Sequence, residues 1–314
     1  MPSRRNNEMR VAKAEAARES VHRVKRHPVR QTLGRALTVV GVVAMLLGIA
    51  VIVPDFMNEG RYRRLSDTSV SAIDPDDTSQ TSSYDWDALK RQNSDTFGWV
   101  TLANTTIDYP VVQSNEREYI HKSFWGDYSA AGTPFADPRC SATGRNVVIY
   151  GHHMGSSGIM FSDIFDGYNQ DKFDTFGDLT WSYPGHDGET LKPVACINVY
   201  ETFAPIQQFR FNPTDEQIDE EYAKMEAHGS FKTQDAPNAD ALTEARRAEA
   251  ADAVVTKMWR EWLKHMLSDD GIKGIAVNPD YKKLIDSSTH DVSLVCCSSL
   301  RGGQPWRAIL ICVA

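Results

Sequence analysis

Residues 293–310, "SLVCCSSLRGGQPWRAIL", place two adjacent cysteines between two apolar runs. The runs "DVSLVCC" and "RAILICVA" are short and rich in Val and Ile, which is typical of β-strands. The Gly-Gly and Pro between them favour a loop joining antiparallel strands. That pairing would bring Arg307, ten residues beyond Cys297, alongside this cysteine. A guanidinium there could donate hydrogen bonds to an oxyanion or a substrate carbonyl.

A second stretch, "NVVIYGHHMG" at 146–155, supplies a candidate partner for a cysteine nucleophile. A thiol becomes reactive when a cation or a general acid/base lies nearby. Gly151 ends an apolar run and allows a turn, so His152 is expected at the rim of a sheet, where functional groups concentrate. The alternatives are ordinary ones: an exposed loop histidine, and two cysteines buried in a strand.

The rest of the chain beyond residue 84 predicts a mostly β fold with helical insertions. Residues 98–113 predict a hairpin with its turn at Asn104 and Thr105, and "LKPVACINVYETF" predicts another strand. A short helix is predicted near 86–97. Many short strands with few helices favour an antiparallel barrel or sandwich.

Two longer helices are predicted within an insertion at about 214–267. The first has Thr214 and Gln217 spaced as a capping box and Gly229 as its stop. The second spans 243–267 and is expected to turn one apolar stripe toward the core. That stripe consists of Val255, Met258, Trp262 and Met266.

The N-terminal region predicts a membrane anchor. Residues 36–53, "ALTVVGVVAMLLGIAVIV", are apolar or small and uncharged, nearly long enough to cross a bilayer. A signal peptide and a buried helix are the alternatives. Residues 1–35 carry ten Lys or Arg and three Glu, so they are expected in the cytoplasm, with the remainder outside. Residues 54–83 are polar and predict a stalk, and residues 84–314 predict the catalytic domain.

Charge and cysteine spacing exclude other classes of function. The chain carries −8 in total, so the part beyond the basic leader carries about −15, which argues against a nucleic-acid partner. The five cysteines suggest no disulfide framework and have no zinc-site spacing. Neither a metal nor another cofactor is expected.

Together these motifs resemble the sortase family of membrane-anchored cysteine transpeptidases. "SLVCC" aligns with the family pattern T-L-x-T-C and differs from it at two of five positions. The run from "LKRQNSDTFGWV" through "IDYPVVQ" to "YSAAGTPFAD", with the helical insertion, is similar to class B sortases. The resemblance covers 84–314. It implies a closed β-barrel preceded by one transmembrane helix, with His152, Cys297 and Arg307 as the catalytic residues.

The resemblance also implies a reaction. Cys297 would cleave the C-terminal sorting motif of a secreted protein through a thioester, and an amine of peptidoglycan or of a pilin lysine would resolve it. The adjacent Cys296 leaves open a misassigned nucleophile or a vicinal disulfide. A cysteine hydrolase and a non-catalytic surface ectodomain are the competing functions. The acidic residues frequent after the cysteine in class B are replaced by Ser298 and Ser299.

Overall fold

The structure is a computed structural model that describes residues 9–15, 28–69, 84–115, 117–155, 157–297 and 305–314. The side chains at 28–33, 47, 50–56, 69 and 297 lie outside this description. The chain divides into two compact units, Met1–Pro54 and Asp55–Ala314. The second unit contains all of the described strands and the candidate site.

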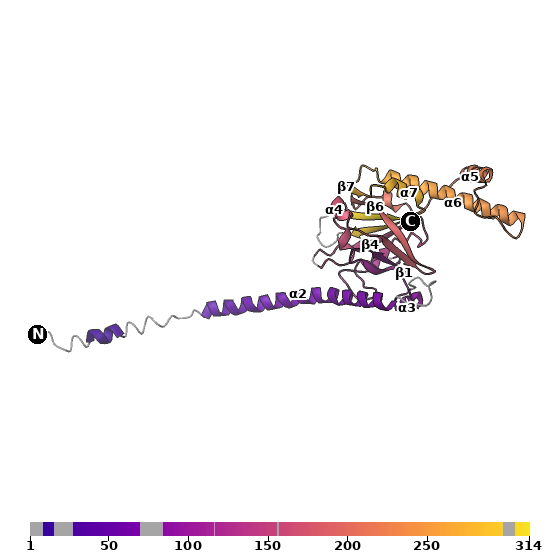
Figure 1. The fold of residues 1–314 in the computed structure, drawn as a ribbon. Coiled ribbons are helices and arrows are strands. Elements are labelled where there is room, and N and C mark those ends of the chain that lie inside the picture. The colour runs from indigo at the N-terminus through magenta and orange to yellow at the C-terminus, as the bar shows by residue number, and fades with distance from the viewer. Residues whose placement is uncertain (1–8, 16–27, 70–83, 116, 156, 298–304) are drawn as a thin grey trace. The chain divides into compact units, whose positions relative to one another are not determined.

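Nine strands form one sheet in the order β5-β1-β2-β3-β4-β8-β9-β6-β7. Because β5 also pairs with β6, the first eight in this order close into a barrel, and β7 adds to the edge of β6 (Figure 1). The predicted barrel with helical insertions is therefore confirmed. The strands are β1 Thr96–Leu102, β2 Asp108–Val112, β3 Phe135–Ala136, β4 Asn146–His152, β5 Leu179–Tyr183, β6 His186–Tyr200, β7 Gly274–Val277, β8 Asp291–Cys297 and β9 Trp306–Val313.

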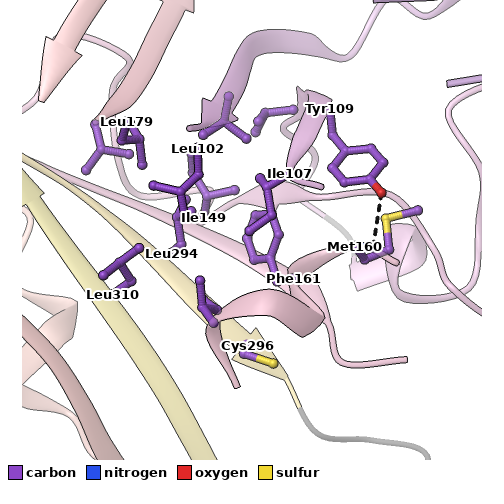
Figure 2. Packing of buried hydrophobic residues seen from close by; sticks show 14 of the residues in the cluster. Leu102, Ile107, Tyr109, Ile149, Met160, Phe161, Leu179, Leu294, Cys296 and Leu310 are labelled. Atoms are coloured by element: carbon purple, nitrogen blue, oxygen red, sulfur yellow. Dashed lines mark hydrogen bonds between the residues drawn. The ribbon is translucent and has the colours of Figure 1, made fainter. Parts of the chain in front are cut away.

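The central strands alternate between two hydrophobic clusters, as the period of two predicts. Ile149, Leu294 and Leu310 point into the barrel and are fully buried there (Figure 2). Their neighbours Val148 and Val295 face outward and pack beneath helices. Burying each such side chain stabilises the fold by about 1.5–3 kcal/mol.

Two helices pack on the outer sheet face through residues such as Trp259 and Ile285, whereas the helix at 215–228 buries no side chain. The capping box between Thr214 and Gln217 is present, and Gly229 ends that helix with φ +60°, so both predictions are confirmed. The helices of the second unit that follow residue 84 are α3 Trp86–Gln92, α4 Gln170–Phe173, α5 Asp215–His228, α6 Ala239–Met266 and α7 Tyr281–Ser287. Short 3₁₀ turns are η1 Arg117–Ile120, η2 Phe161–Ile164 and η3 Pro205–Gln207.

The face that helix α6 presents to the barrel coincides only in part with the predicted stripe. Met266 of the predicted stripe is buried, but its other members are only half-buried, namely Val255, Met258 and Trp262. The buried face instead carries Trp259 and Leu263, one residue further along the chain. Helix α6 carries apolar residues on both the predicted face and the neighbouring face. The position of the outer sheet face determines which of these residues pack against it.

Helix α2, Pro28–Ser69, extends through half of the predicted stalk. Tyr62 and Leu65 are buried in the barrel core, because residues three and four apart share one helix face. Residues 57–68 thus include buried side chains, and 70–83 lie outside the described residues, so the stalk at 54–83 stays a prediction. Within the described part of the chain, no helix is both long and apolar enough to cross a bilayer, so the anchor at 36–53 stays a prediction.

A buried carboxyl at the start of β8 ties α6 to the sheet. Asp291 accepts hydrogen bonds from the Trp259 indole at 2.7 Å and the Ser293 hydroxyl at 2.9 Å. Burial nevertheless raises the pKa of Asp291 to about 7 from its usual 3.8. The folded state therefore holds a proton that the unfolded chain has lost between these two values.

We expect the Asp291→Asn variant to remove a pH dependence of stability. The wild-type contribution of Asp291 is fully present below pH 4 and is lost as the pH rises through 7, by at most about 1.4 kcal/mol per pH unit. Denaturant unfolding at pH 5 and pH 8 would measure it, with exposed Asp171→Asn as the control. An unchanged pH 5 to pH 8 difference in Asp291→Asn would contradict this assignment.

Candidate active site

Three strand positions form one row at an edge of the barrel. β4 ends at His152 and β8 ends at Cys297, and because these strands are parallel, their ends lie together. The register pairs His152 with Cys297, and Cys297 with Arg307 in β9. Directly paired positions are roughly 4.5–5.5 Å apart. The fold thus brings together the three positions predicted from the sequence, while their catalytic roles stay a prediction.

His152 is almost completely buried, at 5% exposure, beneath the segment that follows η1. Its Nε2 lies 2.7 Å from the carbonyl oxygen of Ile120. A carbonyl oxygen can only accept, so Nε2 carries a proton. Nδ1 is then the ring nitrogen whose protonation distinguishes the imidazolium from the neutral ring. The ring also stacks on His121, with 5.9 Å between the centroids.

Arg307 is held by a carboxylate that the sequence analysis missed. Its Nη2 donates to Glu201 Oε2 at 3.0 Å, and its Nη1 donates to the carbonyl of Trp306. Glu201 directly follows β6, which pairs with β9 so that Val199 lies opposite Arg307. The carboxylate therefore comes from the end of another strand. The positions after Cys297, where acidic residues are frequent in class B sortases, are serines at 298 and 299 in this chain. Knowledge of the strand order would have revealed it.

Cys296 lies in a different environment from the row of His152, Cys297 and Arg307. It is fully buried in the inner cluster and pairs with Gly151 in β4 (Figure 2). A Cβ on Gly151 would lie 2.6 Å from the Phe161 ring. Gly151 is therefore required by this close packing and not by the predicted turn, since β4 continues through His152. The inner face at Cys296 is filled by core side chains.

The neighbouring His153 packs away from the row. Its ring stacks on Phe165 at 4.0 Å, and its backbone bridges to Met160. Among the residues that the structure describes, no group of three or more His, Cys, Asp or Glu is placed to hold a metal ion.

Comparison with known proteins supports the predicted resemblance. No family model matches the chain. Over 117 residues, 36% of this chain, it is 35% identical to sortase B of Listeria monocytogenes. Over 91 residues, 28% of this chain, it is 31% identical to sortase B of Staphylococcus aureus. The chain is related to class B sortases.

The matched segments span 46% and 36% of those two sortases' own lengths. The structure of a sortase B from B. anthracis matches 82% of this chain and 96% of that chain, with a TM-score of 0.51 and 16% identity. This match shows that the fold is that of a class B sortase.

Proposed function

We propose that this class B sortase relative is a cysteine transpeptidase with Cys297 as nucleophile, His152 as general acid/base and Arg307 as oxyanion or substrate ligand. The observation that carries the proposal is the cross-strand row of these three positions. Cys296 is the poorer candidate because it is fully buried in the barrel core. The Glu201 carboxylate supports the role of Arg307 by fixing its guanidinium.

The proposed reaction has two acyl-transfer steps. His152 takes the thiol proton of Cys297. The thiolate attacks the scissile carbonyl carbon of a sorting motif, and Arg307 stabilises the resulting oxyanion. The intermediate expels the amine fragment, which His152 protonates, and a thioester remains. An acceptor amine then attacks the thioester. His152 takes its proton, an amide forms and the thiolate is released.

The proposed setting is the outer face of a cell membrane. The anchor would be residues 36–53, with residues 1–35 in the cytoplasm, supported by the apolar run and the basic leader in the sequence. The donors would be secreted proteins with a C-terminal sorting motif, and the acceptor an amine of peptidoglycan or of a pilin lysine. Detergent extraction and protease protection of cells expressing the chain would test this topology.

Intact-mass spectrometry would test the reaction. The full chain is incubated with a panel of sorting peptides, with and without acceptor amines such as triglycine. A transpeptidase forms a thioester adduct that amines resolve into an amide product. A hydrolase releases the free acid at the same rate with or without amine. A chain that forms no adduct with any peptide would contradict both.

Two adjacent histidines provide a matched test of the acid/base assignment. We expect His152→Ala to lower the acylation rate by about 10²–10⁴-fold, because proton transfer to the leaving amine is lost. His153→Ala should stay within severalfold of wild type, since its ring packs on Phe165. The acylation rates of the two variants would be compared by quenching the reaction at successive times and measuring the thioester by mass spectrometry. Equal losses in both variants would refute the assignment.

A further inference from the structure

Within the proposed reaction, we infer that Tyr62 of helix α2 is a positioning residue for His152 and acts through the loop 119–133. Nothing in the local sequence connects these two residues, which are 90 positions apart. The connection is a series of short polar contacts in the second compact unit.

The Tyr62 hydroxyl makes buried polar contacts between helix α2 and the loop. It lies 3.0 Å from the Thr133 hydroxyl and accepts the Phe124 N–H at 3.1 Å. Thr133 donates its own hydrogen to the Lys122 carbonyl at 2.8 Å, so the single proton of the Tyr62 hydroxyl is directed at the Thr133 hydroxyl and at the Gly132 carbonyl, 3.3 Å away. Burial raises the pKa of Tyr62 to about 12, which keeps this donor protonated.

The same loop holds the carbonyl that contacts His152. Thr133 N–H donates to the Tyr119 carbonyl at 3.0 Å, which fixes the peptide just before Ile120. Gly132, with φ +65°, packs so closely that a Cβ would lie 2.6 Å from the Ile120 oxygen. That oxygen is the acceptor for His152 Nε2 at 2.7 Å.

The consequence for His152 is a fixed tautomer and ring orientation. With the proton held on Nε2, Nδ1 is the nitrogen that exchanges the proton with the leaving and incoming amines. If the Ile120 carbonyl moves, the ring loses its preference for this tautomer. The fraction of enzyme molecules with His152 in the tautomer and orientation needed for proton transfer then falls. Tyr62 and Thr133 are 1% and 2% exposed, so water does not replace a lost contact easily.

The first test reads the tautomer directly. Full chain carrying Cys297→Ala and ¹⁵N-labelled histidine is examined by NMR at pH 8.5, with His152→Ala assigning the signals. We expect Nε2 of His152 to be protonated, and Tyr62→Phe to shift the ring toward a mixture of tautomers. Ser66→Ala, which removes another hydrogen bond of α2, to Asp108, should leave the signals unchanged.

The second test uses the acylation rate of chains with Cys297 intact. Tyr62→Phe should lower the maximal rate about tenfold with little change in KM for the peptide, because orientation and not binding is affected. Thr133→Val removes this contact from the loop side, together with the Thr133 hydrogen bond to the Lys122 carbonyl, and should also lower the maximal rate. Unchanged Nε2 signals in both variants would overturn the inference, as would failure of both to fold. If wild type forms no thioester, the proposed function fails, while the NMR result still decides the role of Tyr62.

Discussion

Cys297→Ala is expected to abolish thioester formation, with a loss of at least about a thousandfold in the acylation rate. No other thiol occupies the row, since position 297 is the one that pairs with both His152 and Arg307. The measurement is the mass of the intact chain after incubation with a sorting peptide. A thioester that still forms in Cys297→Ala would refute the assignment of the nucleophile.

Cys296→Ala is the matched control for this loss. Position 296 pairs with Gly151 and Ala308 and is fully buried, so the change removes one core sulfur. We expect a small loss of stability, about 1 kcal/mol, and near wild-type acylation. The reverse result is acylation lost in Cys296→Ala and kept in Cys297→Ala. It would mean that Cys296 is the nucleophile and that β8 pairs with β4 and β9 in another register during the reaction.

The pairing of Cys297 with Arg307 was predictable from a local pattern, whereas His152 was placed beside them by the resemblance to sortases. Gly-Gly and Pro favour the loop after Cys297, and the ten-residue spacing suits an antiparallel partner at Arg307. The partners of these residues were not predictable. Glu201 reaches Arg307 from β6, and the Ile120 carbonyl reaches His152 from η1, and neither contact leaves a sequence pattern. The acceptor for His152 is a backbone carbonyl, which every residue type has, so no particular side chain in the sequence marks its position.

The fold divides in the same way. The strands follow from the alternation of apolar and polar residues, and the capping box at Thr214 follows from one hydrogen-bonded turn. A short stretch of sequence is enough to specify either feature. The docking of α2 does not follow from such stretches, because its described side chains at 57–68 are mostly polar, and the apolar ones buried among them are Tyr62 and Leu65. Its remaining contacts are specific hydrogen bonds and a cation–π contact of Arg61 over Trp125 at 3.8 Å. Composition therefore could not indicate the buried contacts of this helix.

Trp259→Ala is expected to produce the largest loss of stability, about 3–5 kcal/mol from the cavity alone. Trp259 is fully buried between α6 and the outer sheet face. Its indole also donates to Asp291, so removing it leaves a buried carboxyl with one donor fewer. Such a loss is a large fraction of the 5–15 kcal/mol typical of a domain. Denaturant unfolding monitored by circular dichroism would measure it.

Two variants separate the causes of this loss. Trp259→Phe keeps most of the volume and loses the donor, so its cost should be smaller, about 1–3 kcal/mol, and larger at pH 8 than at pH 5, where Asp291 is mostly protonated. Trp262→Ala makes the same truncation on the same helix at a half-buried site, where the indole donates to the Pro205 carbonyl at 3.2 Å. It should cost less than Trp259→Ala, because less apolar surface returns to water. A greater cost for Trp262→Ala would show that α6 docks through the stripe predicted from the sequence.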